Sequence, residues 1–292
     1  MKRAHHTRGI LFILLAGILW GALGSMARVA LAEGMAPLDV AFWRAVIGWG
    51  FFLAHAASRR ALKIDRRDLP LVALFALVSV SGFYGSYQLA VRYGGAARAS
   101  VLLYTAPAWV AIMAVLFLRE SLSPRILVGV LVSIVGVAVI SLSGTEQGEA
   151  APQGILFGLI SGFTYALYYI LGRRLLDRYR SITLFFWILP IGAVGLAPFV
   201  SFSIPSLPAA AALLGIGFAS TYLAYLVYAA GLRYLRSSQA AVVATIEPVA
   251  AVLMAFAFWG ENLGGAGYVG ALLVVTSVLL QVQPHRPESH PR

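Results

Sequence analysis

Cysteine is absent from this sequence of 292 residues, and charged residues are scarce at 11%. The lack of cysteine excludes disulfide bonds and thiolate metal sites. Soluble domains carry about a quarter charged residues, whereas here 60% of the residues are hydrophobic and the mean hydropathy is +0.85. The composition therefore predicts a protein that resides in a lipid bilayer.

Catalytic signatures are also missing. The sequence contains no GxxxxGK[ST] phosphate loop and no HExxH metalloprotease motif, and the serines of "SGFYGSY" (81–87) have no neighbouring base. We expect no catalytic residue, no metal, no cofactor and no ATP hydrolysis. The rival protein classes are a membrane enzyme, and a receptor or scaffold without flux. The histidines lie at the termini or at a helix end: His5, His6, His55, His285 and His290.

Ten apolar runs are long enough to cross a bilayer, which takes roughly 17 to 25 residues. They do not favour a closed β-barrel, whose strands are alternating runs of about ten residues. The first run (9–27) follows a basic start and also resembles a cleaved signal peptide, but it exceeds the signal core of about 7 to 15 residues. We expect ten helical spans, centred near Leu19, Gly48, Val80, Ala108, Val132, Phe163, Gly192, Phe218, Leu253 and Val274.

The formal charge of +11 is distributed unevenly between the joints of these spans. With the N-terminus in the cytoplasm, the opposite side keeps only Arg28, Arg92 and Arg98, as the positive-inside rule requires. The basic character therefore needs no nucleic acid partner, and both termini are expected in the cytoplasm. The cytoplasmic clusters are Lys2/Arg3/Arg8, Arg59/Arg60/Lys63/Arg66/Arg67, Arg119/Arg125, Arg173/Arg174/Arg178/Arg180, Arg233/Arg236 and Arg286/Arg292.

The chain is internally duplicated. A displacement of 141 positions aligns the segment that starts at Arg92 with the segment that starts at Arg233, and it pairs Pro107 with Pro248. Each unit holds five spans, so the second unit enters the membrane from the other side, and inverted repeats of this kind are typical of secondary transporters. We expect an all-α membrane protein of ten transmembrane helices in two inverted five-helix repeats, 1–146 and 147–292.

Small residues recur at helical spacing in the sixth expected span. Gly154, Gly158 and Gly162 are four positions apart. A stripe of this kind allows close packing of helices in a membrane. We expect it to serve packing rather than binding.

Paired motifs carry a family resemblance that covers nearly the whole chain. "LRESL" (118–122) and "WGENL" (259–263) end the fourth and ninth spans, and "FWRAVIG" (42–48) surrounds Arg44. The sequence resembles the ten-helix EamA-type members of the drug/metabolite transporter superfamily, and it is also similar to the aromatic amino-acid exporters of that group. One departure is Arg119, at a position where the family usually has glycine.

Glu247 and Pro248 lie inside the ninth span, on the order of 14 Å deep at about 1.5 Å per residue. A charge at that depth costs about 2.5 kcal/mol or more, and proline removes a backbone donor. Pro107 repeats the break in the fourth span, and paired broken helices indicate a binding centre. Glu247 is therefore expected either to bind substrate or a coupling ion, or to form a structural ion pair with Arg44, which we take as a structural charge.

Polar and aromatic side chains follow helical spacing in several spans. The displacement of 141 pairs Tyr84 with Tyr225 and Tyr87 with Tyr228. Trp43, Trp187, Trp259 and Tyr268 fit the interfacial belts that are common in membrane proteins, and mid-span tyrosines can also serve helix packing. The expected lining of a central path is Trp20, Ser81, Tyr84, Tyr87, Gln88, Tyr104, Tyr165, Tyr168, Tyr169, Tyr222, Tyr225 and Tyr228, with Pro107, Glu247 and Pro248.

These features predict a secondary transporter of a bacterial inner membrane that exports a small metabolite by alternating access. Flat aromatic faces stack on rings, and a carboxylate can meet an ammonium group. Phenylalanine, tyrosine and tryptophan are the leading substrates, followed by other apolar amino acids. A carrier of drugs, nucleotide sugars or sugar phosphates is the alternative, although a phosphate needs basic ligands. The expected partners are a small-molecule substrate and the lipid bilayer, and proton coupling remains open.

Overall fold

The computed structural model describes residues 2–94, 96–142, 151–260 and 264–282. Within these ranges every regular element is a helix and there is no strand. The helices form ten segments that are long and apolar enough to cross a membrane, from Ala4–Ala32 to Gly264–Gln281. The predicted all-α membrane fold with ten spans is confirmed.

Five of the ten spans are single α-helices, and the third, fourth, seventh, eighth and ninth are built from shorter pieces. In chain order the elements are α1 (Lys2–Ala32), α2 (Pro37–Ser58), α3 (Leu69–Ala76), η1 (Leu77–Gly82), α4 (Phe83–Gly94), α5 (Ala96–Leu103), α6 (Ala106–Leu118), α7 (Pro124–Leu142), α8 (Pro152–Leu176), α9 (Ser181–Leu196), η2 (Ala197–Phe199), α10 (Leu207–Gly215), η3 (Ile216–Leu223), α11 (Ala224–Leu232), α12 (Ser237–Ala244), α13 (Ile246–Trp259) and α14 (Gly264–Val282).

The two predicted helix breaks are present. The fourth span is interrupted between α5 and α6, and the ninth span is interrupted at Thr245 between α12 and α13. Pro107 and Pro248 each lie in the first turn of the piece that follows, where a helix does not need the missing backbone N–H. The two spans are thus interrupted at corresponding positions, just before the prolines.

The third and eighth spans contain π-helical segments that the sequence does not predict. Both η1 and η3 are widened turns in the middle of their spans. They contain Ser79 and Ser220, which are 141 positions apart. A π-helical turn carries one extra residue per turn and changes the direction of side chains and carbonyls, and such turns are frequent at functional sites.

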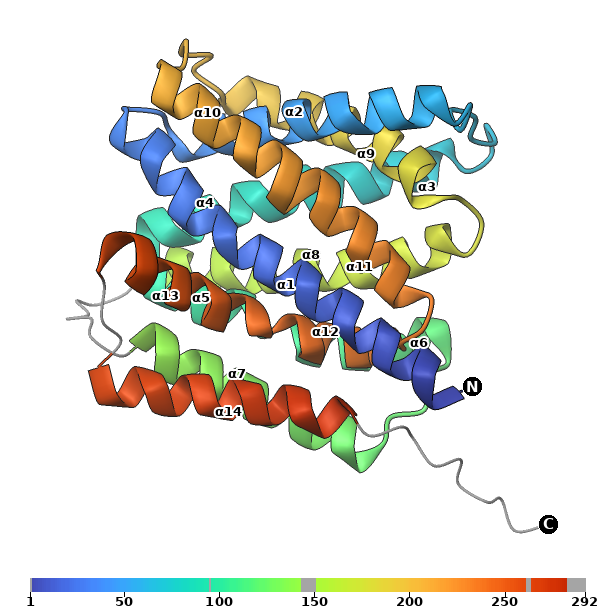
Figure 1. Cartoon of the computed structure of the whole chain (residues 1–292), viewed down its shortest axis with the longest axis vertical. Coiled ribbons are helices and arrows are strands. Elements are labelled where there is room, and N and C mark those ends of the chain that lie inside the picture. The colour runs from blue at the N-terminus through green and yellow to red at the C-terminus, as the bar shows by residue number, and fades with distance from the viewer. Residues whose placement is uncertain (1, 95, 143–150, 261–263, 283–292) are drawn as a thin grey trace.

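Helices from the two halves of the chain interleave. In Figure 1, α7 and α14 lie side by side along their length, and α1 crosses the bundle next to α11 and α13. Each such contact has a counterpart: α1 packs on α11 and α13, and α8 packs on α4 and α6. Likewise α2 contacts η3, and α9 contacts η1. Both halves are needed to build the interior.

The glycine stripe of α8 packs as expected. A Cβ on Gly154 would lie 2.7 Å from the backbone of Gly94, and one on Gly158 would lie 2.4 Å from Leu102. A Cβ on Gly162 would meet the carbonyl oxygen of Leu102 at 2.6 Å. The stripe therefore brings α8 against α4 and α5, and the prediction that it serves packing is confirmed.

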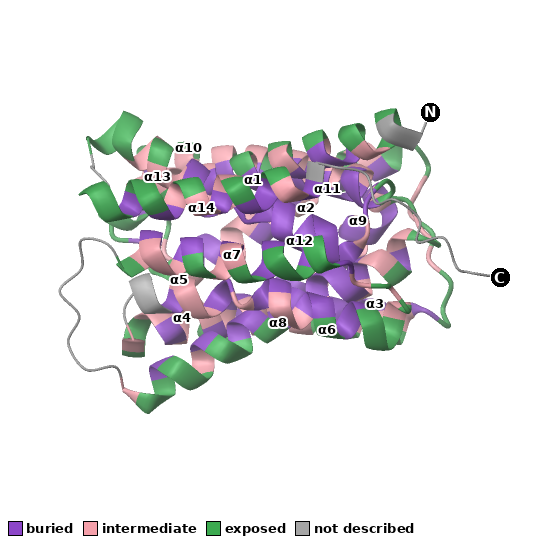
Figure 2. Cartoon of the chain, turned by 90° about the horizontal axis from the view of Figure 1, so that it is seen from below, coloured by how far each residue is buried: buried purple, intermediate pink, exposed green. Residues whose placement is uncertain are grey.

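Buried residues lie in the interior of the bundle and exposed residues on its outside (Figure 2). Many of the exposed residues are large and apolar. Leu116, Phe117, Leu131 and Leu272 are each about two-thirds exposed, on helices α6, α7 and α14. Surfaces of this kind are rare on soluble monomers and suit contact with lipid chains. The outside of the bundle is therefore its lipid-facing surface.

The loops between the spans lie at two opposite ends of the bundle. One end, which we call the packed end, carries the start of α1, the end of α14, the α2–α3 loop and the α8–α9 loop, where Asp65 N–H donates to Tyr179. The other, the cavity end, carries the α1–α2 turn, where the Ser206 hydroxyl donates to Glu33. Arg60 and Arg178 belong to the packed end and Ser206 to the cavity end. Glu146, which we expect on the side opposite to Arg178, lies outside the described residues.

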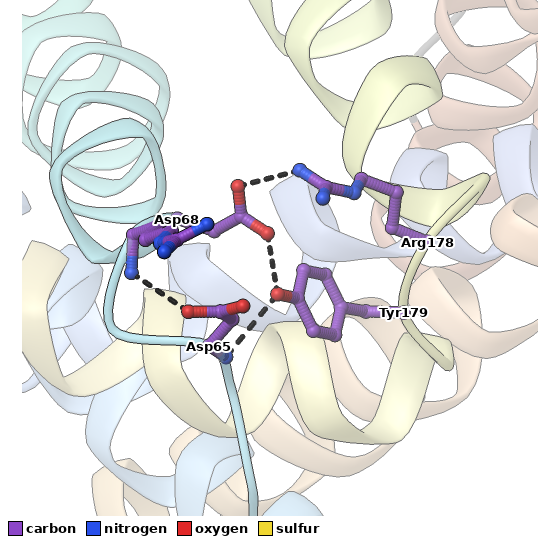
Figure 3. Close-up of polar contacts among 5 residues, drawn as sticks. Asp65, Asp68, Arg178 and Tyr179 are labelled. Carbon is purple, nitrogen blue, oxygen red and sulfur yellow. Dashed lines mark hydrogen bonds and ion pairs between the residues drawn. The ribbon is translucent and has the colours of Figure 1, made fainter.

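A polar cluster joins two loops at the packed end (Figure 3). Arg178 contacts Asp68 Oδ1 at 2.6 Å, and the Tyr179 hydroxyl donates to the other oxygen of Asp68. This hydrogen bond from the phenol to Asp68 is the main cause that raises the pKa of Tyr179 above its usual value of 10.0. The cluster fastens the start of α3 to the α8–α9 loop.

A second contact at the packed end joins the two halves through Glu120. Its carboxylate accepts hydrogen bonds from the Ser237 and Ser238 backbone N–H groups at 2.8 and 3.3 Å, and from the Ser238 hydroxyl at 2.7 Å. These donors form the first turn of α12, whose N–H groups have no partner within the helix. Glu120 from the first half therefore caps a helix of the second half.

The departure at Arg119 has a visible structural consequence. Arg119 and Gly260 end α6 and α13, and both adopt the left-handed conformation, with φ of 53° and 69°. Only glycine takes this conformation without a steric penalty, which for other residues is about 1–2 kcal/mol. The same helix ending is therefore used in both halves, at some cost in the first.

Candidate functional site

A cavity of about 630 Å³ lies inside the bundle. It extends from the middle of the spans, at Trp20, Tyr225 and Glu247, to the cavity end, at Leu31 and Pro37. Its volume is within the range of about 300–1,000 Å³ that is typical of small-molecule sites. Of the residues predicted from the sequence, it is lined by Trp20, Tyr84, Tyr87, Gln88, Tyr104, Tyr165, Tyr168, Tyr225, Glu247 and Pro248, and also by Arg44.

Five residues of the predicted lining are outside this cavity. The Ser81 hydroxyl donates to the Gly192 carbonyl at 2.8 Å, and the Tyr222 hydroxyl contacts His55 Nδ1 at 2.9 Å. Tyr228 packs beneath the cavity floor, with its ring 5.4 Å from that of Trp20. The helical spacing that predicted these residues does not specify which face of a helix meets the cavity. The remaining two, Pro107 and Tyr169, surround a void of about 10 Å³ next to the helix breaks.

Glu247 lies directly after the break in the ninth span. The Tyr165 hydroxyl donates to its Oε2 at 3.4 Å, and Tyr104 of the fourth span lies near this carboxylate in the cavity wall. Tyr169 in turn donates to the Tyr165 hydroxyl at 3.3 Å. The carboxylate thus lies among tyrosines of α8 and of the other broken span while it remains part of the cavity wall.

Arg44 extends from α2 into the cavity wall and is held by the π-helical segment η3. Its Nε donates to the Thr221 hydroxyl at 2.9 Å, and its Nη2 donates to the Ser220 carbonyl at 3.3 Å. The guanidinium also lies 5.0 Å from the centre of the Tyr84 ring, a cation–π contact. The widened turn of η3 thus has a clear local role, since it supplies acceptors to a half-buried cation.

Arg44 and Glu247 do not form the ion pair that the sequence left open. In the part of the chain that the structure describes, no carboxylate lies within 4.0 Å of Arg44 and no cation lies within 4.0 Å of Glu247. The two charges still interact electrostatically across a longer distance. The cavity wall therefore presents one cation and one anion as separate poles.

Aromatic rings form the floor of the cavity. The hydroxyls of Tyr84 and Tyr225 meet at 3.2 Å, and these residues are 141 positions apart. The Tyr168 ring lies 5.7 Å from the Tyr225 ring and 6.5 Å from the Trp20 ring. Below this layer the bundle is filled by side chains that are less than 2% exposed, among them Tyr228 and Phe185. The aromatic layer separates the cavity from the packed end.

Three buried polar atoms of residues that line the cavity have no hydrogen-bond partner among the described residues: Trp20 Nε1, Ser79 Oγ and the Tyr168 hydroxyl. These atoms have almost no accessible surface, so they do not face the open part of the cavity. Ser79 was missed from the sequence, although its counterpart Ser220 at the displacement of 141 touches Arg44 through its carbonyl. The repeat offset is the signal that would have found it.

Comparison with known proteins agrees with this architecture. A model of the EamA-like transporter family matches residues 7–142 and again residues 152–283. An uncharacterized transporter of Archaeoglobus fulgidus is 29% identical over 253 residues, which cover 85% of this chain and 90% of that protein. The uncharacterized transporter YvbV of Bacillus subtilis is 28% identical over 287 residues, covering 96% and 93% of the two chains.

Two further proteins are similar over most of their length. The uncharacterized inner membrane transporter YicL of Salmonella typhimurium is 22% identical over 283 residues, 94% of each chain. A protein of known crystal structure with 18% identity superposes with a TM-score of 0.82 over 93% of this chain and 95% of that one, which shows a common fold. Because the family model covers nearly the whole chain in two matches, the chain belongs to the EamA-like transporter family, as a multi-pass membrane transporter and not an enzyme.

Proposed function

We propose that this transporter exports amino acids with aromatic or apolar side chains from the bacterial cytoplasm, by alternating access through the central cavity. The observation that carries the proposal is the composition of the cavity wall. Aromatic rings from five spans surround it, and Glu247 is the one acidic residue among the described residues that line it. A ring of the substrate can stack on the aromatic floor while its ammonium group meets the carboxylate.

Alternating access rests on the proposal that the two halves are inverted repeats. Its support is the pairing of features at the displacement of 141: the Tyr84–Tyr225 contact, the segments η1 and η3, and the breaks before Pro107 and Pro248. A second conformation then results when each half adopts the packing that the other half has now. In that conformation the cavity opens at the packed end and closes at the cavity end.

The orientation and location of the protein are part of the proposal. Basic residues concentrate in the loops of the packed end. This end therefore lies on the cytoplasmic side of a bacterial inner membrane, and both termini are cytoplasmic. The cavity of this conformation then faces outward. Export loads substrate in the alternate, inward-facing conformation and releases it from the present one.

A phosphate-bearing substrate is the second candidate, because Arg44 does line the cavity. A sugar phosphate or nucleotide sugar needs basic ligands for its phosphate. Among the described residues that line the cavity, Arg44 is the one basic residue, and Glu247 of the same wall would repel a phosphate dianion. A zwitterion complements both charges, so an amino acid suits this wall better than a phosphate ester or a drug that carries a single charge.

Counterflow in proteoliposomes tests the proposal. Vesicles loaded with unlabelled tryptophan should accumulate labelled tryptophan above empty liposomes, whereas a sugar phosphate should not accumulate. Replacing Tyr84, Tyr104 or Tyr225 by alanine should depress tryptophan uptake several-fold, since stacking area is lost, and should affect alanine uptake less. Tyr222→Ala is the matched control, because this tyrosine lies on the same span as Tyr225 but outside the cavity.

The outcomes distinguish the transporter assignment from the amino-acid assignment. Should wild-type protein move neither tryptophan nor alanine but move a phosphate ester, the amino-acid assignment is wrong while the transporter assignment stands. Should all four tyrosine variants reduce the uptake of tryptophan and alanine alike, the tyrosines serve packing and not substrate selection.

A further inference from the structure

We propose that Arg44 binds the carboxylate of the transported amino acid, so that the cavity holds its substrate by both charged groups and distinguishes amino acids from amines. This inference rests on the proposed function and gives Arg44 a role that its sequence position does not indicate. It follows from how the guanidinium is held, from its lack of a counter-ion and from the position of Glu247.

Two N–H groups of the Arg44 guanidinium are bound by described residues of η3. Nε and Nη2 donate to Thr221 and Ser220, and the Tyr84 ring lies 5.0 Å away. A guanidinium has five N–H donors, and these two bonds use two of them. The group is therefore oriented and still has donors for a carboxylate, which it can bind in a two-pronged geometry.

The charge of Arg44 has no counter-ion among the described residues. A cation inside a transmembrane span is costly, and such residues usually pair or face a water-filled cavity. Here the neutral acceptors Thr221 and Ser220 solvate the cation without neutralising it. An ordinary structural arginine would have its carboxylate within contact distance, whereas Arg44 leaves that place to a group that enters the cavity.

Glu247 supplies the opposite pole on a different helix. It accepts a hydrogen bond from Tyr165, and it has no cation within 4.0 Å in the described ranges. An α-amino acid carries its ammonium and carboxylate on one carbon, and both can be met directly or through water in a cavity of about 630 Å³. The side chain is then directed to the aromatic floor near Trp20, Tyr168 and Tyr225.

Binding of three related ligands to the purified full-length protein tests the inference. Tryptophan carries both charges, tryptamine lacks the carboxylate, and indole-3-propionate lacks the ammonium. Calorimetry should show that wild-type protein binds tryptophan about ten to a hundred times more tightly than tryptamine, the value of a charge-assisted contact. Arg44→Gln should abolish this preference by weakening tryptophan binding while leaving tryptamine binding unchanged. Glu247→Gln should instead abolish the preference for tryptophan over indole-3-propionate.

Arg92→Gln is the matched control, since Arg92 is exposed on α4 and does not line the cavity. If Arg44→Gln does not fold, Thr221→Val removes the acceptor of Nε, leaves the charge in place and should weaken tryptophan binding more than tryptamine binding. Equal binding of tryptophan and tryptamine to wild-type protein, or an equal loss of both in the variants, would overturn the role of Arg44 alone. Absence of any tryptophan binding to wild-type protein would overturn the proposed function, and the inference with it.

Discussion

The cavity end and the packed end of the bundle are built from corresponding elements of the two halves but differ in structure. At the cavity end the helices surround a void that reaches the middle of the membrane, and Asp39 and Glu33 of the first half bind serines between η2 and α10. At the packed end the interior is filled by aromatic and aliphatic side chains, and Asp68 and Glu120 connect loops and helix ends. Internal duplication therefore coexists with an asymmetric conformation, as alternating access requires.

The nature of the contacts at the packed end indicates how that end can open. The Arg178 side chain of the pair with Asp68 is 60% exposed, and exposed ion pairs stabilise by about 0–1 kcal/mol. The deeper barrier is the aromatic layer, where Trp20, Tyr168 and Tyr225 separate the cavity from the packed core. The polar connections are individually weak enough to be exchanged during a transport cycle.

The largest expected effect is the difference in labelling between the two ends. The natural chain has no cysteine, so single cysteines can be placed freely. In intact cells an impermeant maleimide should label Ser206→Cys at the cavity end and Ser100→Cys in the cavity wall, because both face outward in the proposed orientation. Arg178→Cys at the packed end should react only after the membrane is opened.

The sequence positions Glu146 and Arg178 provide an independent check, since they fall in different joints of the predicted spans. Labelling of residues 146 and 178 from the same side would show that the inverted arrangement of the halves is wrong. Labelling of Ser206→Cys from outside without labelling of Ser100→Cys would show that the cavity of the protein in cells opens at the packed end.

Glu247→Gln should have the next largest effect. The amide is similar in size and keeps the contacts to Tyr104 and Tyr165 but cannot hold an ammonium group or a proton. We expect tryptophan counterflow at neutral pH to fall at least about tenfold, as the loss of a charge-assisted contact of about 1.5–3 kcal/mol implies. The pH dependence of transport should flatten, and the melting temperature should be retained.

Glu120→Gln is the comparison at the packed end, because it makes the same change in a carboxylate outside the cavity wall. It should leave tryptophan binding unchanged. If Glu247→Gln transported normally at every pH but melted at a lower temperature, the carboxylate would be structural and the polarity of the cavity would have another purpose.

Much of the fold could be predicted because bilayers constrain sequences strongly. The length of apolar runs determined the ten spans, and the prolines at 107 and 248 located the two helix breaks. The segments η1 and η3 could not be predicted, since no residue type specifies a π-helical turn. At η3 the neighbouring helix comes close, since a Cβ on Gly48 of α2 would meet Thr221 at 2.6 Å.

The site was predicted in part. Ionisable residues deep in a span are rare, so Glu247 and Arg44 were evident from the sequence, but their separation depends on packing between α2, η3 and α13. Helical spacing suggested Tyr222 and Tyr228 together with Tyr225, and only Tyr225 faces the cavity. Spacing of three residues turns a helix by about 300°, so successive members drift away from one face. Which member lines a path depends on the rotation of the helix, and tertiary contacts determine that rotation.

The smallest expected effect is a difference in stability between two alanine variants, one at Glu120 of the packed end and one at Glu33 of the cavity end. Glu120 accepts three hydrogen bonds from the first turn of α12, whereas the exposed Glu33 accepts one from the Ser206 hydroxyl. Loss of a helix cap costs about 0.5–2 kcal/mol, and loss of an exposed polar contact usually costs less than about 0.5 kcal/mol. Glu120→Ala should therefore lower the free energy of unfolding in detergent by about 1 kcal/mol more than Glu33→Ala.

Glu120→Ala should also weaken the closure of the packed end, because α12 is held to the first half by this carboxylate and by the contact of Arg236 with the Ser121 carbonyl. A cysteine at position 237, which lies fully buried in the first turn of α12, should then react faster with a maleimide than in the unsubstituted background. The Glu33→Ala variant should leave that rate unchanged. Equal rates in both backgrounds, together with equal stability of the two alanine variants, would show that the aromatic layer alone closes the packed end and that the carboxylate cap adds nothing to it.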